Sequence, residues 1–139
     1  MTNNKINRRG TARRAPTSQI GRWAECVAAH FLERGGFKIL ARNFNTRFGE
    51  LDIVCQEERG AKAGAPSIIF IEVRFRSKGS LLLPEESITN KKQRRIKFAA
   101  SIYLNKFGLA DAFVRFDVIC VSKDKWFTPA KVQHIVDAF

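Results

Sequence analysis

The stretch SIIFIEVRF, residues 67–75, decides the fold, because apolar residues fill both of its faces. Successive side chains of a strand point to opposite sides of a sheet, so Ile69, Ile71 and Val73 share one face. The other face carries Ile68, Phe70, Glu72 and Arg74. A strand that is apolar on both faces lies in the centre of a sheet, with its polar side chains near its end. We therefore expect a central strand here.

Further β-forming segments flank this strand along the chain. Two precede it, over residues 37–43 and 47–56, and a polar, glycine-containing loop over residues 57–66 connects the second of them to it. Two more are predicted after it, over residues 112–122 and 131–136. The first three strands predict an antiparallel meander.

Two segments have the period of amphipathic helices. After Ser18, a typical N-cap, the apolar residues recur at intervals of three and four up to the Gly35-Gly36 pair, which predicts the helix end. A second, longer helix is expected from Pro84 in its first turn to about Phe107, with Glu85 and Glu86 near its positive end. The element order αβββαβ predicts an α/β domain with a mixed sheet flanked by helices.

The composition favours one basic domain that contacts a polyanion. The 139 residues contain 25 Lys and Arg against 13 Asp and Glu, which gives a net charge of +12. The length suits a single core, so we expect a flexible basic arm over residues 1–17 and one domain over residues 18–139. A positive charge of this size favours nucleic acid as the partner.

Neither a membrane segment nor a disulfide framework is indicated. No apolar run reaches the roughly 18 residues of a spanning helix, and no signal-peptide pattern follows the basic N-terminus. Cys26, Cys55 and Cys120 are odd in number, widely spaced and set among apolar neighbours, which predicts reduced and mostly buried thiols. We expect a cytoplasmic protein with no membrane partner.

Two short acidic motifs are the part of the sequence that suggests a catalytic or metal-binding site. Gly49-Glu50-Leu51-Asp52 lies in the second strand and Ile71-Glu72-Val73-Arg74 in the third. If these strands pair, the acids converge, and carboxylates without a counter-charge repel one another and are costly to desolvate. A divalent cation would neutralise them, with Asp52, Glu72 and the carbonyl of Val73 as ligands, and Mg²⁺ or Mn²⁺ is the expected cofactor. Metal-assisted phosphodiester hydrolysis needs such ligands, a positioned water and a nearby cation.

A structural interpretation of the same acids stays open. Asp52 and Glu72 would then be strand-end acids neutralised by arginines, for which the chain offers Arg47, Arg74 and Arg115. Glu50, directly after Gly49, is more typical of a solvated or salt-bridged side chain than of a metal ligand, and we assign it a supporting role. Arg115 and Asp117 share a strand face and predict a structural ion pair. His30 and His134 stand alone and are interpreted as ordinary structural or surface residues. Trp23 and Trp126 are interpreted as core or sheet-packing residues rather than as base-stacking platforms.

Several short motifs occur in the same order along the chain as in a known family. They are Gly21-x-x-x-Glu25, Asn43, the two acidic motifs, Lys91 and Arg115-Phe116-Asp117. From about Gly21 to Phe139 the chain resembles the YraN family of small bacterial proteins. That family looks like the PD-(D/E)XK endonuclease fold and is similar, in the order of its acids, to archaeal Holliday-junction resolvases. The resemblance implies Glu25, Asp52 and Glu72 as active-site acids, with Asp52 and Glu72 as the metal ligands.

One position departs from the family pattern. The third strand of the family normally reads Glu-x-Lys, and here Arg74 replaces that lysine. Arginine keeps the charge and grips phosphate, but it is effectively always protonated and cannot exchange a proton as lysine does. Arg74 is therefore a catalytic residue with reduced competence or the mark of a binder that has lost catalysis. Lys91 or Lys92, at the start of the next helix, is a candidate for the missing ammonium.

The first half of the second helix is densely basic. Its cations are Lys91, Lys92, Arg94, Arg95 and Lys97, with no acid among them. We interpret Lys91, Lys92, Arg94 and Arg95 as phosphate-binding residues, which would give a salt-dependent affinity with little sequence preference. No helix-turn-helix, zinc finger or RNA-binding motif is present, so branches, flaps or single-strand junctions are the expected targets.

Three functional hypotheses follow. The first is a Mg²⁺- or Mn²⁺-dependent endonuclease acting on DNA, with branched DNA as one expected substrate. The second is a non-catalytic nucleic-acid binder on the same fold, and the third is a basic scaffold or assembly protein. A resolvase would require a homodimer because a four-way junction needs paired cuts, but the sequence identifies no dimer interface.

Overall fold

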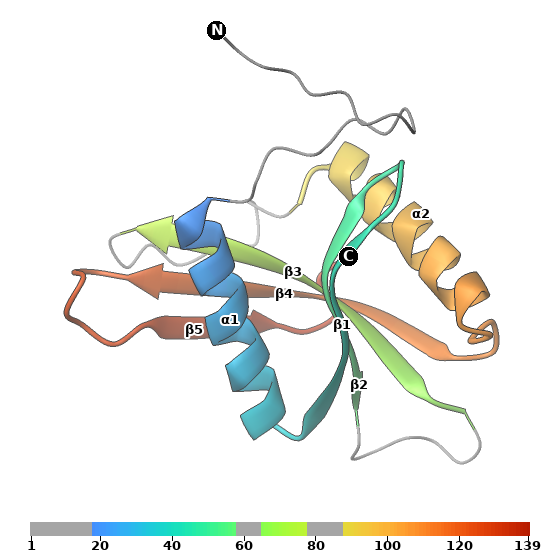
Figure 1. The fold of residues 1–139 in the computed structure, drawn as a ribbon, viewed down its shortest axis with the longest axis horizontal. Helices are drawn as coiled ribbons and strands as arrows, with labels where there is room; N and C mark the ends of the chain where they lie inside the picture. Colours follow the sequence, from blue (N-terminus) through green and yellow to red (C-terminus); the bar gives the residue numbers. More distant parts are fainter. Residues whose placement is uncertain (1–17, 58–64, 78–87) are drawn as a thin grey trace, which may run out of the picture.

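The computed structural model describes residues 18–57, 65–77 and 88–139. Its elements follow the order α1 (Gln19–Arg34), β1 (Phe37–Asn45), β2 (Glu50–Glu57), β3 (Ser67–Ser77), α2 (Asn90–Lys106), β4 (Phe113–Lys123) and β5 (Lys131–Ile135) (Figure 1). The predicted arm over residues 1–17, and Pro84 with its two acidic neighbours, lie outside the described residues. The fold is the predicted α/β arrangement of a five-stranded mixed sheet with two flanking helices, which is compatible with a nuclease-like core.

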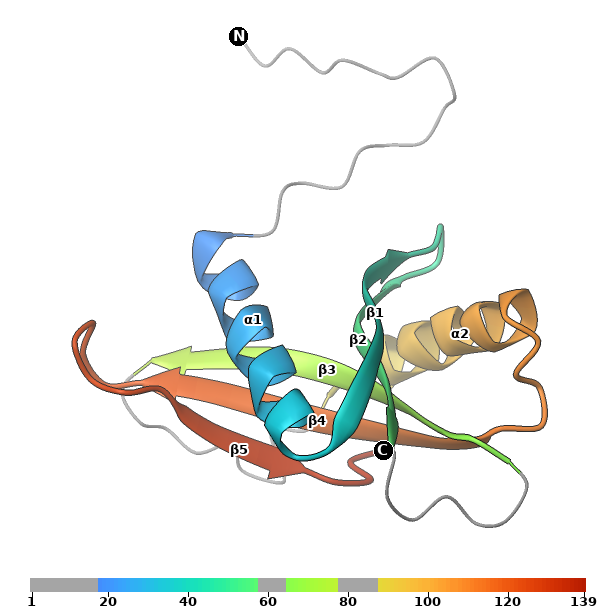
Figure 2. The same ribbon diagram turned by 60° about the horizontal axis from the view of Figure 1, so that its bottom comes forward.

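β3 lies in the centre of the sheet, as its two apolar faces predict. The strand order is β1-β2-β3-β4-β5, with β1, β2 and β3 forming the expected antiparallel meander. β3 and β4 are parallel along their whole length, from Ser67 opposite Phe113 to Ser77 opposite Lys123. A parallel pair needs a crossover connection, and α2 forms part of it. The tip of the β1–β2 hairpin stands out from the plane of the other strands (Figure 2).

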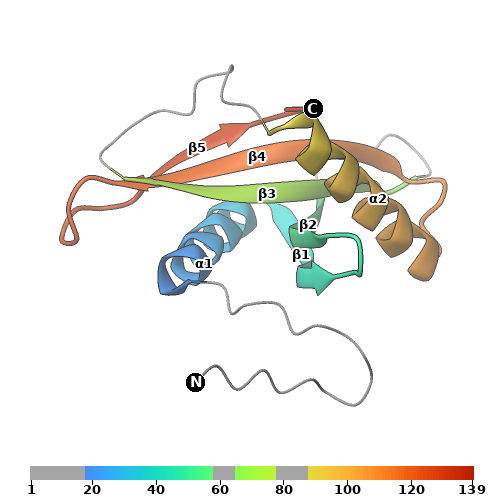
Figure 3. The same ribbon diagram turned by 90° about the horizontal axis from the view of Figure 1, so that it is seen from above.

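The two faces of the sheet have separate cores. Ile68 and Phe70 pack with Ile96 and Tyr103 of α2 in one core cluster. The other cluster joins the alternate residues of β3, β4 and β2 to α1 and contains Ala24, Ala28, Ala29, Leu32, Ile53, Cys55, Ile69, Ile71, Ile119 and Val121. The predicted division of the β3 side chains between two faces is therefore confirmed. Figure 3 shows α1 and α2 at different positions along β3 and β4.

The second helix begins later than predicted. It starts at Asn90, where the Thr89 side chain accepts a hydrogen bond from the Lys92 amide as an N-cap, and its first turn holds no acid. Proline in a first turn is only one start signal, and a threonine that caps the free amides is another. Lys91 and Lys92 therefore lie in the first turn of α2, next to the end of β2 that contains the acidic motif of residues 49–52.

Two expectations about single residues need correction. Trp126 is not a core residue, since 85% of its surface is exposed in the loop between β4 and β5. Cys55 and Cys120 are buried as expected, but Cys26 is exposed. Trp126 and Cys26 have apolar neighbours in the sequence, yet they lie on a loop and on the outer side of a helix, where those neighbours do not enclose them.

Candidate metal centre and nucleic-acid interface

The two acidic motifs lie next to each other at the point where β2 and β3 separate. The regular pairing of these strands ends with Ile53 opposite Ile71, so Asp52 and Glu72 are the first residues beyond it. There the Val73 amide donates a hydrogen bond of 2.9 Å to Asp52 Oδ2 in place of a strand carbonyl. The side chain of Asp52 thus fills the position of a missing ladder bond and is held at the point of separation.

β1 and β2 are also irregular beside Asp52. Arg42 pairs with Ile53 and Phe44 with Leu51, which leaves Asn43 opposite Asp52. Asn43 has a positive φ of 52°, a conformation that asparagine adopts more readily than most residues. Leu51 packs on the α2 side of the sheet and Ile53 on the α1 side, so the side-chain alternation that would place Glu50 and Asp52 on one face is interrupted here. Glu50 itself is half-buried at the start of β2, opposite Asn45.

Glu25 approaches the two strand acids from α1. It is only 6% exposed, Glu72 is 5% exposed, and the Oε2 atom of Glu25 is buried without a hydrogen-bond partner among the described residues. Burial and the charge of Glu72 raise the pKa of Asp52 to about 7, with a further contribution from Glu25, while the Val73 amide and Lys92 act in the opposite direction. The site therefore disfavours the charged form of Asp52, first through burial and then through repulsion by Glu72 and Glu25. We call Glu25, Asp52 and Glu72 the acid cluster.

Among the described residues, Lys92 is the cation that reaches the acid cluster. Its ammonium group forms an ion pair with Glu72 Oε1, while Lys91, one residue earlier on the helix, is exposed. The sequence offered either lysine as the source of an ammonium, and the structure brings Lys92 to this position. Arg74 is half-buried two residues beyond Glu72 and makes no ion pair with the acid cluster within the described part of the chain.

The acid cluster fits a divalent metal ion in its chemistry but not in its present geometry. Carboxylate oxygens are the ligands that Mg²⁺ and Mn²⁺ prefer, and one buried oxygen of Glu25 lacks a partner. Over residues 18–57, 65–77 and 88–139, however, no three His, Cys, Asp or Glu side chains lie in positions that would hold an ion. One oxygen of Asp52 is engaged by the Val73 amide and Glu72 is engaged by Lys92. A metal ion would therefore compete with Lys92 for Glu72.

The predicted phosphate-binding residues form an exposed face at the start of α2. We call Lys91, Arg94 and Arg95 the basic face, because their positions at i, i+3 and i+4 lie on one side of a helix and all three are exposed. Lys92 is also half exposed and connects this face to Glu72. A Cβ added to Gly49 would lie 3.3 Å from the Arg95 carbonyl oxygen, so the β1–β2 hairpin approaches α2 closely. The basic face and the acid cluster are therefore neighbours.

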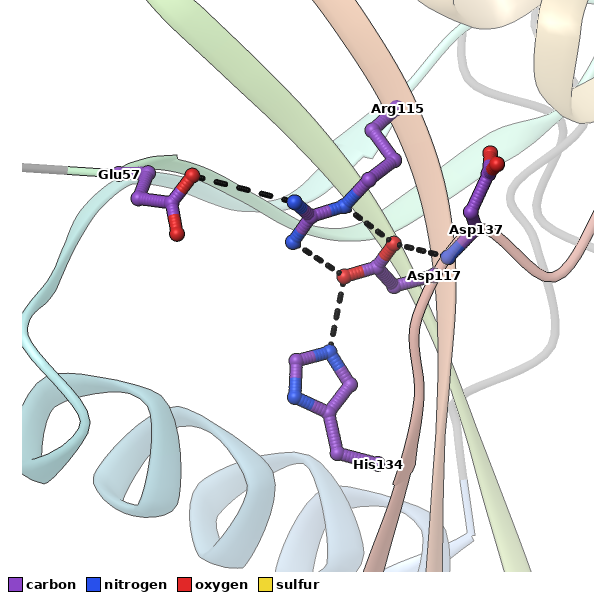
Figure 4. A network of polar contacts seen from close by, with 5 residues as sticks. All are labelled: Glu57, Arg115, Asp117, His134 and Asp137. Carbon is purple, nitrogen blue, oxygen red and sulfur yellow. Dashed lines mark hydrogen bonds and ion pairs between the residues drawn. The ribbon is translucent and has the colours of Figure 1, made fainter. Parts of the chain in front are cut away.

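A second polar network has a structural role. Asp117 is completely buried and accepts hydrogen bonds from Arg115 Nε at 2.8 Å, Arg115 Nη2 at 2.9 Å and the Asp137 amide at 2.9 Å (Figure 4). His134 Nε2 lies 2.8 Å from Asp117 Oδ2, the oxygen that also accepts from Arg115 Nη2, and Glu57 Oε2 lies 3.8 Å from Arg115 Nη1. The predicted ion pair of Arg115 and Asp117 is present. Sequence reasoning missed its partner His134, which the antiparallel pairing of β4 and β5 brings close.

Comparison with known proteins identifies the family. The model of the uncharacterised protein family UPF0102 matches residues 24–121, a range that contains the acid cluster and the basic face. The chain belongs to the UPF0102 family. UPF0102 is the YraN family that the sequence motifs resemble, so the predicted family membership is confirmed.

UPF0102 relatives match most of the chain and most of their own length. A UPF0102 protein of Syntrophomonas wolfei is 36% identical over 121 residues, which cover 87% of this chain and 97% of that protein. One of Moorella thermoacetica is 39% identical over 129 residues, with 93% and 99% coverage. One of Syntrophotalea carbinolica is 42% identical over 120 residues, with 86% and 90% coverage.

The described helices include none that is long and apolar enough to cross a membrane.

Proposed function

We propose that this UPF0102 protein is a metal-dependent endonuclease that hydrolyses phosphodiester bonds in DNA. The observation that carries the proposal is the convergence of three acids from α1, β2 and β3 at one break in the sheet, in a chain with a net charge of +12. Buried carboxylates that repel one another cost stability, so a fold that gathers them is expected to use them.

The residues divide into ligands and groups that act on the substrate. Asp52 and Glu72 would hold Mg²⁺ or Mn²⁺, and the Val73 carbonyl would add a third oxygen. The bound ion would supply Lewis-acid stabilisation of phosphate charge and a water of lowered pKa. Glu25, with its unpartnered oxygen, would accept a hydrogen bond from the attacking water and orient it.

Two cations would stabilise the charge that develops on the phosphate. Lys92 is in contact with Glu72, and its ammonium group would stabilise the charge of a phosphate bound beside the acid cluster. Arg74 would bind a phosphate oxygen from the end of β3 through its planar guanidinium. Lys92 thus takes the part that lysine has in the family pattern, and Arg74 is left with substrate binding.

A non-catalytic nucleic-acid binder is the second candidate. The observation in its favour is the ion pair between Lys92 and Glu72, because it engages a predicted ligand, together with Arg74 in place of the family lysine. In that case the basic face would bind phosphates and the acid cluster would be vestigial.

One assay separates the two candidates. The protein is incubated with linear, flapped and four-way-junction DNA, with EDTA, Mg²⁺ or Mn²⁺, and both binding and cleavage are measured. Cleavage that requires the metal ion supports the nuclease, and preference for the junction supports a resolvase-like substrate. Binding without cleavage under every condition rejects the nuclease in favour of the binder.

Replacing Lys92 with methionine is expected to slow metal-dependent cleavage by about 100-fold, since one cation next to the reacting phosphate is lost. Lys91→Met removes the same charge one residue away and serves as the matched control. It is expected to weaken DNA binding without changing the rate at saturating DNA. Single-turnover kinetics measures both, and equal rates for the two variants would contradict the role of Lys92.

Replacing Lys91, Arg94 and Arg95 with glutamine is expected to weaken DNA binding and to flatten its salt dependence. Each lost phosphate contact reduces the slope of log affinity against log salt by about 0.9, so the triple variant should lose up to about 2.7. The matched control removes three exposed cations elsewhere, Arg34, Lys38 and Lys106. A titration of fluorescent DNA at several salt concentrations gives the slopes. Equal slopes for the two triple variants would show that only net charge matters.

A further inference from the structure

A pocket of about 420 Å³ lies between the start of α1, the end of β3 and the β4–β5 loop. The side chains that line it include Ile20, Trp23, Phe75, Lys123, Lys125 and Trp126. We call it the aromatic pocket. It is separate from the acid cluster and from the basic face, and none of the roles proposed above uses it.

Two apolar side chains of this pocket, one of them aromatic, are unusually accessible. Trp126 is 85% exposed and Ile20 is 56% exposed, although burial of such side chains is favourable. Trp23 and Phe75 form the fixed wall, because their rings pack edge to face with centroids 6.0 Å apart. The pocket therefore has one rigid aromatic wall and one exposed indole, which leaves a flat aromatic ligand two surfaces to contact.

The charge around the pocket favours an anionic ligand. Lys123 Nζ lies 5.1 Å from the centroid of the Trp23 ring, and Lys125 is exposed at the rim. Asp124, between these lysines, is paired with Lys131 at 3.1 Å, so its charge is compensated. A ligand with an aromatic ring and a phosphate matches both properties, and a nucleotide has both.

The pocket and the acid cluster share two elements. α1 carries Trp23 and Glu25 two residues apart, and β3 carries Glu72 and Phe75 three residues apart. Three residues of a strand span about 10 Å, and about three stacked nucleotides of one DNA strand cover the same length. Along β3 the aromatic pocket therefore begins within about 10 Å of Glu72, although Phe75 and Glu72 point to opposite faces of the strand and a nucleic-acid strand would have to pass from one face to the other.

We propose that the aromatic pocket binds an unpaired nucleobase of the nucleic-acid substrate. The base stacks on Trp126 against the wall of Trp23 and Phe75, and Lys123 or Lys125 contacts an adjacent phosphate. This inference rests on the proposed nucleic-acid function and specifies the substrate as one with a single-stranded segment next to the bond that is cut. Bases in an intact duplex are stacked on one another and cannot enter the pocket.

The test uses binding in EDTA, so that it does not depend on cleavage. Fluorescence anisotropy measures the affinity of the full-length protein for a labelled single-stranded oligothymidine and for a blunt duplex of equal length. Trp126→Ala is expected to weaken binding of the single strand by about tenfold, because loss of one stacking contact has roughly this effect. Trp126→Phe should recover most of the affinity, and duplex binding should change by less than about twofold.

The control is Phe113→Ala, which removes an exposed aromatic ring at the far end of β4 and should alter neither affinity. The proposal is overturned if Trp126→Ala changes neither affinity or lowers both equally, or if the wild-type protein does not bind the single strand. Loss of a dimer in sedimentation with unchanged DNA affinity would identify a self-association surface and also overturn it. Selective loss of single-strand binding in a protein that never cleaves DNA would reject the nuclease and retain the pocket.

Discussion

Asp52→Asn and Glu72→Gln are each expected to reduce metal-dependent DNA cleavage by at least about 100-fold. Both amides keep the size of the side chain and remove the negative charge that a divalent cation needs. Asparagine at position 52 still offers an oxygen to the Val73 amide, so the break between β2 and β3 is preserved. Cleavage of junction DNA at saturating Mg²⁺ measures the loss.

Glu50→Gln is the matched control, since it changes the same group two residues from Asp52. It is expected to retain cleavage within about threefold of the wild type, because a supporting acid contributes little to the transition state. Equal loss in the Glu50 and Asp52 variants would contradict the assignment of the ligands. Full activity of Asp52→Asn would reject the metal centre.

The Asp52 variant should also differ from a structural mutant in stability. Burial and the charge of Glu72 raise the pKa of Asp52 to about 7. The folded protein therefore binds a proton that the unfolded chain has released, and Asp52 lowers stability as the pH rises from about 4 to about 7. At about pH 8 without metal, the free energy of unfolding of Asp52→Asn should equal or exceed that of the wild type. Urea denaturation gives this value, and a large loss would assign Asp52 a structural role.

In contrast to Asp52→Asn, the Asp117→Asn substitution is expected to lower the free energy of unfolding by about 3–5 kcal/mol near neutral pH. The substitution leaves Arg115 and His134 next to a neutral group at a position that is completely buried. Since whole domains are stable by about 5–15 kcal/mol, this single change removes a large part of the total. Urea denaturation measures it.

The pH dependence of the same variant provides a second test. Burial by itself would raise the pKa of Asp117, but hydrogen bonds from His134, Arg115 and the Asp137 amide lower it below its ordinary value of 3.8. The stability from this group is therefore present above about pH 4 and is lost as the pH falls through the lower folded value. The difference between wild type and variant should shrink in acid. Glu57→Gln, which affects an ion pair of 3.8 Å at the partly exposed rim, should cost less than about 1 kcal/mol.

The sheet was predictable because its strands have simple periods. The apolar faces of residues 67–75 placed β3 in the centre, and the same alternation divided its side chains correctly between two cores. The start of α2 was not predictable from Pro84, because a proline and a capping threonine are competing start signals and Thr89 prevails. Trp126 was misassigned because exposure in a loop depends on tertiary packing, which local sequence does not contain.

The candidate site was predictable in its members and not in its contacts. The motifs around Glu25, Asp52 and Glu72 identified these three acids as candidates. The structure brings the three carboxylates close enough for their charges to interact. Which lysine reaches Glu72 depends on the start of α2, and a shift of one residue would turn Lys92 away by about 100°. The interrupted alternation beside Asp52 also has no signal in the pattern of β2, apart from Asn43 on the neighbouring strand.

The hydrogen bond from the Val73 amide to Asp52 makes that amide a spectroscopic reporter of the centre. Most amides of β3 are bonded to strand carbonyls, which do not titrate, whereas the Val73 proton is bonded to a carboxylate. In a ¹⁵N-labelled sample, the Val73 cross-peak should therefore move when Asp52 takes up a proton or a cation. A titration with Mg²⁺ would in this way test for cation binding at a single residue, without DNA and without turnover.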